Sequence, residues 1–292
     1  MEKTKGMSSR HIGMQTALNL RRFFIYLFLA VVAFFCLFPM WTLLVSMTRR
    51  HAEISTSFSF WFGDQLLVNL HNALNDPHLS VGQAFLNSLF ISVTGSILCV
   101  YFSALTAYAI QVYDFKGKDL IFKFILIIMM IPATVSSVGL AQMLTEQHMT
   151  NMFWPLIIPQ IASPVTFFYL KQYMSSILPM EMIEAARVDG AGEFRIFNQM
   201  ALPLVKPALA VQLIFSFVAN WNNFFIPALL INEQGKKTLP LIIAAIKASD
   251  PSSFDMGKTY ALIGVAILPL VFIYLLLSRF IVGGMTEGSV KG

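Results

Sequence analysis

The chain has 292 residues, of which 57% are hydrophobic and only 12% are charged, and its formal net charge is +5. A soluble chain usually carries about 25% charged residues, so this composition excludes an ordinary soluble protein and predicts an integral membrane protein. The two cysteines, Cys36 and Cys99, stand in apolar runs, and we expect buried thiols without a disulfide framework.

The N-terminal region predicts the first membrane span. Residues 1–22 are polar and basic, and Phe23–Met47 then runs without a charge. A secretory signal has an apolar core of only about 7–15 residues, so we interpret the run as an uncleaved spanning helix. Pro39 is expected to kink this helix, and Trp41 is expected at the far interface.

Five further apolar stretches follow, separated by polar loops. The predicted spans are about Ala84–Ile110, Leu120–Met143, Met152–Tyr173, Leu204–Leu230 and Thr259–Ile281. Hydroxyl and small residues throughout the first of these five fit either close helix packing or a wet path. Pro132 lies inside the next span, and three prolines in the one after it predict a bent or broken helix.

Six spans place both termini on one side of the membrane. Fourteen of the 20 lysines and arginines lie in the N-terminal segment, the 111–123 turn, the 171–206 segment and the end from Arg279 onward. The positive-inside rule therefore predicts that these parts are cytoplasmic. The loops 48–83, 144–151 and 231–258 are then external.

The sequence offers no chemistry of its own to drive transport. No predicted mid-span position carries Asp, Glu, Lys or Arg, whereas ion-coupled carriers commonly use buried carboxylates. Gly257-Lys258-Thr259 resembles the end of a phosphate-binding loop, but Ser252 stands where that motif requires glycine. We expect no catalytic residue and no metal site, so energy comes from a partner or the protein is a passive pore.

A long polar segment, Glu181–Pro207, separates the fourth and fifth spans and reads EMIEAARVDGAGEFRIFNQMALPLVKP. Glu181 and Glu184 stand in the first turns of a predicted helix, where acidic residues suit the helix dipole. Glu184 and Arg187 are spaced to pair weakly on the surface. Gly190 is expected to end this helix as a left-handed cap.

A second short helix, about Glu193–Met200, is predicted to stop before Pro203. Ala185 and Ala186 would let another surface approach the first helix closely. Two short helices joined by a glycine corner form a rigid cytoplasmic knob, although an amphipathic loop lying on the membrane fits the same pattern.

The stretch EAARVDGAGEFRIFNQMALPLVKPAL resembles the EAA loop of binding-protein-dependent ABC importer permeases, which has EAA, then a glycine, and later Leu-Pro. Trp221-Asn222 with Phe224 resembles the WN-aromatic stretch of that family. Residues 283–292 resemble the G-x-T-x-GAVKG tail of its MalG-like carbohydrate permeases, and Asn87-Ser88 and Met130-Ile131-Pro132 fit the same subfamily. Asn223 departs from the pattern, because an acidic residue is common there.

The resemblance covers nearly the whole chain and implies an all-α membrane protein with six transmembrane helices and a cytoplasmic two-helix coupling (EAA) loop. Residues 1–22 would form a cytoplasmic segment, 23–282 the permease domain with the coupling loop at 179–207, and 283–292 a cytoplasmic tail. The protein would be one multi-pass subunit of an ATP-driven importer in the bacterial cell membrane, for a sugar or oligosaccharide.

The resemblance also implies the partners. These are a second homologous permease subunit, two ABC ATPase subunits, an extracytoplasmic solute-binding protein, a neutral sugar ligand and membrane lipid, with no nucleic acid. ATP and Mg²⁺ would be bound only by the ATPase subunits. A non-sugar solute such as a glycerol phosphodiester is the nearest alternative, and an ion-coupled carrier, a passive channel and a membrane scaffold are further alternatives.

Three groups of residues receive roles from the resemblance. The ATPase-coupling group is Glu181, Glu184, Ala185, Ala186, Asp189, Gly190 and Pro203. The translocation-path group is Asn87, Ser88, Pro132, Asn220, Trp221, Asn222 and Asn223. Uncharged hydrogen-bonding groups and aromatic rings suit a polyhydroxylated ligand, although asparagines equally form interhelical hydrogen bonds. The tail group is Val290, Lys291 and Gly292, which either contacts an ATPase or is solvated.

Overall fold

The computed structural model describes residues 2–77, 79–247 and 254–288, and all regular secondary structure in these ranges is helical. The chain divides into two compact units, which we describe separately. One unit contains the chain up to Asn72 together with Asp255–Gly264, and the other contains Ala73–Phe254 together with the chain from Val265. The prediction of an all-α chain is confirmed for the described residues.

The first unit begins with α1, Glu2–Ser46, whose apolar part Leu18–Ser46 is long enough to cross a membrane. This helix contains nearly all of the predicted first span, Phe23–Met47. The prediction that Cys36 is buried is wrong, because its side chain is exposed on α1.

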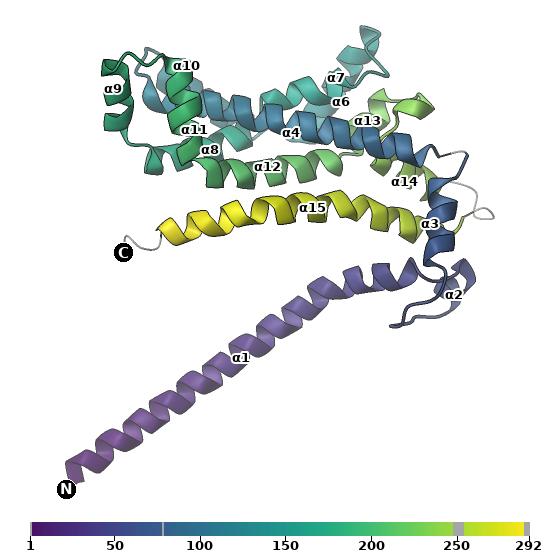
Figure 1. The fold of residues 1–292 in the computed structure, drawn as a ribbon, viewed down its shortest axis with the longest axis horizontal. Helices are drawn as coiled ribbons and strands as arrows, with labels where there is room; N and C mark the ends of the chain where they lie inside the picture. Colours follow the sequence, from purple (N-terminus) through teal and green to yellow (C-terminus); the bar gives the residue numbers. More distant parts are fainter. Residues whose placement is uncertain (1, 78, 248–253, 289–292) are drawn as a thin grey trace. The chain divides into compact units, whose positions relative to one another are not determined.

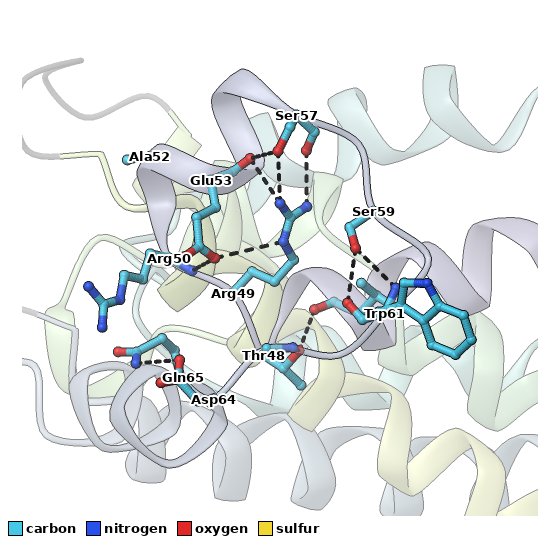
Figure 2. Close-up of polar contacts among 12 residues, drawn as sticks. Thr48, Arg49, Arg50, Ala52, Glu53, Ser57, Ser59, Trp61, Asp64 and Gln65 are labelled. Carbon is cyan, nitrogen blue, oxygen red and sulfur yellow. Dashed lines mark hydrogen bonds and ion pairs between the residues drawn. The ribbon is translucent and has the colours of Figure 1, made fainter.

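The loop after α1 is held to the end of that helix by polar contacts (Figure 2). It contains α2, His51–Thr56, and leads into α3, Leu66–Leu74. The Arg49 guanidinium donates to both the carbonyl and the hydroxyl oxygen of Ser57, each at 3.0 Å. The loop after α1 is therefore an ordered element and not a loose connection.

Aromatic side chains gather at the same end of α1. The Trp41 indole nitrogen donates to the Phe60 carbonyl oxygen at 3.1 Å, and the Phe58 and Phe60 rings pack edge to face with their centroids 4.8 Å apart. Trp61 is 81% exposed. This concentration of aromatic rings at the end of an apolar helix is typical of a membrane–water interface.

Gly257 lies at the start of α15, Met256–Gly288. A Cβ atom at this position would lie 2.7 Å from the Arg49 carbonyl oxygen and 2.7 Å from the Asn69 side-chain nitrogen. Close packing within the first unit therefore requires this glycine, and no phosphate-binding role is needed to account for it.

The second unit is built around α4, Val81–Val112, which packs along α8, Pro164–Ile177, and α12, Lys206–Trp221 (Figure 1). Ala104 and Ala107 of α4 are fully buried and let the neighbouring helices approach closely. The buried residues of this core extend from α4 and α8 into the segment after Met180. The core therefore joins the spans to the predicted coupling segment.

The third predicted span is not one helix. It is formed by α5, Lys118–Ile128, and α6, Ala133–Glu146, which are bent by 92° relative to each other. Pro132 lies at the break, where its ring disfavours a helical conformation for the preceding residue and it lacks a backbone N–H. The span predicted over about Leu120–Met143 is therefore a bent pair of helices.

The fourth predicted span is broken, as its prolines indicate. It consists of α7, Trp154–Ile157, a 3₁₀ segment, Ile158–Ile161, and α8. Each piece has a proline in its first positions, because proline is tolerated where a helix has no internal partner for the N–H.

The remaining predicted spans agree more closely with the structure. The fifth contains α12 and α13, Phe225–Leu230, with a break at 222–224. A 3₁₀ turn, Gln234–Lys236, and α14, Leu239–Lys247, follow in the next connection. The sixth lies within α15, whose apolar part is Met256–Phe280. Four described segments are long and apolar enough to cross a membrane, or five when α5 and α6 count as one.

Candidate functional site

The predicted coupling segment folds into α9, Met180–Val188, and a second helical stretch that begins with α10, Glu193–Ile196. Gly190 has a φ of 79° in the left-handed region. The Gly190 amide donates to the Arg187 carbonyl oxygen, and the Ala191 amide donates to the Ala186 carbonyl oxygen, both at 3.0 Å. These two bonds form a Schellman motif, so the prediction that Gly190 caps the first helix is confirmed.

The second helical stretch does not stop before Pro203. It continues through a π-helical turn, Phe197–Ala201, into α11, Leu202–Leu204. The Leu202 amide donates to the Phe197 carbonyl oxygen, and this wider turn takes the backbone past the residue that cannot donate. The prediction of a helix end before Pro203 is wrong for this reason.

The segment has one buried and one exposed side. Ile183, Ile196 and Phe197 are at most 1% exposed and lie in the core. Ala186 is only 6% exposed, so it packs inward, and the expectation that both alanines offer an approach surface holds only for Ala185. The other predicted coupling residues are exposed: Glu181, Glu184, Asp189, Gly190 and Pro203.

Two apolar side chains on this segment were not singled out from the sequence. Val188 is 87% exposed and Phe194 is 72% exposed. The sequence contained a signal for them, because both are apolar residues that stand outside the apolar face of their short helices. Beside them lies an open groove of about 460 Å³. Its lining residues are Met182, Ala185, Ala186, Asp189, Gly190, Ala191, Arg195, Gln199 and Met200.

The spacing predicted a pair between Arg187 and Glu184. In the structure Arg187 pairs with Glu193 instead. The Arg187 Nε atom lies 2.6 Å from Glu193 Oε1, and Nη2 lies 3.3 Å from Oε2. The hydrogen bond from Arg187 holds the pKa of the Glu193 carboxyl below its ordinary value. Burial, followed by the adjoining Glu193 carboxylate, raises the pKa of Tyr113 above its ordinary value.

An open cavity of about 530 Å³ lies among the apolar helices of the second unit, and most of its lining surface is apolar. We call it the polar cavity because seven of its 13 lining residues have polar, uncharged side chains. Its polar lining comes mainly from the 3₁₀ segment, α8 and α12, and consists of Gln160, Ser163, Thr166, Tyr169, Gln212, Ser216 and Asn220. The side-chain nitrogen of Asn220 is buried and has no hydrogen-bond partner among the described residues. Asn220 is therefore the predicted path residue with a donor available at this cavity.

The other asparagines and Trp221 have packing or capping contacts. Trp221 is 2% exposed, and its indole nitrogen donates to the Ala266 carbonyl oxygen at 2.9 Å. Asn223 Oδ1 accepts from the Ile226 amide at the start of α13, while Asn222 is exposed. Pro132, also exposed, lies at the break of the third span.

Asn87 and Ser88 hold the loop that follows α13. The Asn87 amide group donates to the carbonyl oxygens of Gly235 at 2.9 Å and Lys237 at 3.0 Å. Ser88 Oγ accepts from the Leu239 amide at 2.8 Å. These two residues do not line the polar cavity. Gln160 and Gln212 do line it, and neither was predicted, because a single glutamine in an apolar run forms no motif.

Two further predictions concern the C-terminal tail and metal binding. Val290, Lys291 and Gly292 lie outside the described residues. Within the described ranges, no group of three or more His, Cys, Asp or Glu side chains is arranged to hold a metal ion.

Residues 100–287 match the family described as binding-protein-dependent transport system inner membrane component. The chain belongs to this family. The match begins within α4, and it includes the coupling segment and all the residues that line the polar cavity except Cys99. This inner-membrane transport component is therefore a membrane subunit of an importer.

Curated relatives of this transport component match over most of their length. The arabinooligosaccharides transport system permease protein AraQ of Halalkalibacterium halodurans is 31% identical over 266 residues, covering 90% of this chain and 94% of the relative. The trehalose/maltose transport system permease protein MalG of Thermococcus litoralis is 30% identical over 277 residues, covering 94% and 98%.

A solved structure shares the fold of this transport component. It is the crystal structure of a bacterial ABC transporter involved in the import of the acidic polysaccharide alginate, with a TM-score of 0.76 and 20% identity. The match covers 87% of this chain and 94% of that chain.

Proposed function

We propose that the chain is a permease subunit of an ATP-driven importer that carries a sugar or oligosaccharide. The observation that carries the substrate class is the names of the relatives that are about 30% identical to this chain. Two are named for arabinooligosaccharides and for trehalose and maltose, and another, 29% identical, is named for melibiose, raffinose and stachyose. The cavity supports the same class, because its mainly apolar lining contains several uncharged hydrogen-bonding side chains that suit a hydroxyl-rich ligand.

In this proposal the chain crosses the membrane six times. The broken third and fourth spans each count as one crossing, since irregular backbone is tolerated at membrane depth where it is covered by protein or lines a cavity. Both termini and residues 179–207 are cytoplasmic, with 1–22 and 283–292 as flanking segments around the permease domain 23–282. The lysine and arginine distribution supports this orientation.

The proposed complex contains a second homologous permease, two ABC ATPase subunits and an extracytoplasmic solute-binding protein. ATP and Mg²⁺ are bound by the ATPase subunits. α9 is the coupling helix, with the exposed Glu181, Glu184, Ala185 and Val188 facing an ATPase. Closure of the ATPase dimer moves the segment as a rigid body and opens the path outward.

The ligand path in this subunit passes the cavity at Asn220. A buried amide nitrogen without a partner costs about 1–3 kcal/mol, and a passing sugar hydroxyl supplies the missing acceptor. In this proposal Asn87 and Ser88, which hydrogen-bond to the 235–239 loop, shape the external end of the path. The tail residues Val290 to Gly292 are proposed to contact an ATPase.

Purification of the tagged chain from membranes of its host, in mild detergent, tests the assembly. The proposal expects two ATPase copies, one second permease and ATP-dependent sugar uptake after reconstitution. Glu184→Lys is expected to abolish uptake and to leave insertion of the chain into the membrane unchanged. A stable homomer that transports without an ATPase would contradict the proposal.

A further inference from the structure

We propose that Glu193 is a positioning residue that fastens the coupling segment to the inner end of α4, so that α4 receives the movement of α9 directly. We call Arg187, Glu193, Tyr108 and Tyr113 the carboxylate clasp. The proposal rests on the proposed function, because it takes an ATPase acting on α9 as the source of movement.

The carboxylate clasp joins three elements through one side chain. Glu193 opens α10, Arg187 lies in the last turn of α9, and Tyr113 is the cap residue of α4. The Tyr113 hydroxyl donates to Glu193 Oε2 at 2.6 Å, and the Tyr108 hydroxyl donates to the same oxygen at 3.4 Å. Arg187 occupies Oε1 at 2.6 Å.

An ionised carboxylate suits this task because it only accepts hydrogen bonds and has about four acceptor positions on its two oxygens. A bidentate arginine fixes the plane of the carboxylate as well as its distance. The guanidinium carbon of Arg187 also lies 5.4 Å from the centre of the Tyr113 ring, within the range of a cation–π contact. Arg187 is therefore held to α4 as well as to α10.

A second contact to α4 lies further along the same stretch. The Phe197 ring lies 5.2 Å from the Tyr108 ring and 5.8 Å from the Tyr101 ring, measured between centroids. The Tyr101 hydroxyl donates to Asn198 Oδ1 at 3.3 Å. Two attachments, one at the start of α10 and one at the start of the π turn, prevent the coupling segment from pivoting on α4.

The two attachments have different physical roles. Apolar burial holds surfaces together without direction, so the Phe197 contact alone lets the segment slide along α4. Charge-assisted hydrogen bonds are directional and short, so the carboxylate clasp fixes the register of the segment. α4 packs along α8 and α12, which carry the polar cavity, and it therefore passes the movement to the ligand path.

A role in stability alone is a weaker account of this cluster. The side chains of Arg187 and Glu193 are 34% and 42% exposed, and ion pairs at such exposure contribute little to folding. The directional hydrogen bonds of Arg187 and Glu193 fix the position of the coupling segment on α4. The test must therefore measure how movement of α9 reaches the polar cavity, and not only whether the complex assembles.

The test uses the assembled complex in proteoliposomes, with Cys36 and Cys99 replaced by alanine and a reporter thiol introduced by Ser216→Cys in the polar cavity. The probe is a membrane-impermeant methanethiosulfonate reagent added outside. The measured quantity is the labelling rate with ATP and vanadate divided by the rate without nucleotide. No sugar is needed for this measurement.

Glu193→Gln is expected to lower this ratio about tenfold, the low end of the effect of losing a hydrogen bond to a charged group. Tyr113→Phe is expected to lower it in the same direction, and the double variant is expected to be no worse than Glu193→Gln alone, because the two residues act as a unit. Asp119→Asn, an exposed carboxylate in the first turn of α5, is the control and keeps the parent ratio.

The outcomes separate the clasp from the proposed function. A parent complex whose ratio is one contradicts the proposed function itself. A parent complex with a high ratio that both Glu193→Gln and Tyr113→Phe retain overturns the carboxylate clasp alone. If Glu193→Gln fails to assemble, Tyr113→Phe decides, because it removes a single hydroxyl: a lowered ratio supports the clasp and a parent ratio overturns it.

Discussion

Gly190 gives a sharp prediction because its backbone conformation, and not its packing, excludes other residues. Its φ is 79°, and a Cβ atom built there meets nothing within 4 Å. A side chain in the left-handed region costs about 1–2 kcal/mol for most residues, whereas asparagine adopts this region more readily. The free-energy cost of replacing Gly190 therefore rises from Asn to Ala to Val.

Each 1.4 kcal/mol changes an equilibrium constant about tenfold, so Gly190→Ala should open the Schellman motif about tenfold more often. Hydrogen exchange at the Ala191 amide, which the Ala186 carbonyl protects, measures this opening in the assembled complex. Gly190→Asn should exchange nearly as the parent does, and Gly190→Val should exchange fastest.

Gly192→Ala is the matched control two residues along. The φ of Gly192 is −69° and its position is open, so only the small change in N-cap preference remains. Equal exchange in Gly190→Ala and Gly190→Asn would refute the conformational reasoning. A larger effect from Gly192→Ala than from Gly190→Ala would also refute it.

Three further predictions concern other parts of the protein. Trp221→Phe leaves the Ala266 carbonyl without its 2.9 Å donor and should destabilise the purified protein by about 1–3 kcal/mol, seen as a lower thermal midpoint, whereas Trp154→Phe, at a half-exposed site, should have little effect. Asn87→Ala frees the Gly235 and Lys237 carbonyls and should speed tryptic cleavage at Lys236 and Lys237 from the external side several-fold, while Asn232→Ala should not; cleavage only from the cytoplasmic side would contradict the orientation. The pKa of Glu193 in the folded protein lies below its ordinary value of 4.5, so its contribution to stability is present above the unfolded pKa and is lost as pH falls through the folded pKa. Docking of α10 on α4, measured by hydrogen exchange corrected for intrinsic rate, should therefore be constant from pH 7 to 5 and weaken only below pH 4.5. Loosening between pH 7 and 5.5 would contradict this assignment.

The parts of the fold that the sequence predicts best are those set by local chemistry. Composition and long apolar runs gave the all-helical chain and the first, second and sixth apolar helices. Gly190 identified the cap because glycine is favoured in the left-handed region. Pro155, Pro159 and Pro164 identified the broken fourth span, since each lacks a backbone donor.

The parts that failed depend on contacts between distant residues. The i,i+3 spacing favoured a pair between Glu184 and Arg187, but Glu193 is brought beside Arg187 by the Gly190 turn and is held there by Tyr113 from α4. Pro203 was predicted to end a helix, but a π turn upstream accommodates it. Local spacing contains neither of these tertiary effects.

The candidate path shows the same limit. Four adjacent residues, Asn220 to Asn223, appeared to form one polar cluster in the sequence. In the structure their side chains have different surroundings and contacts, because the helix ends at Trp221 and the backbone turns after it. Only a fold places Asn220 with Gln160 and Gln212 around one cavity.

The central claim is that α9 is the surface on which an ATPase acts. A photo-crosslinking amino acid at Val188, which is 87% exposed, tests this in native membranes, with the same amino acid at Phe124 of α5, which is 60% exposed, as the control. The account predicts an adduct between the chain and an ATPase subunit from Val188 and none from Phe124. Absence of any ATPase adduct from Val188 in an assembled, transporting complex would contradict it.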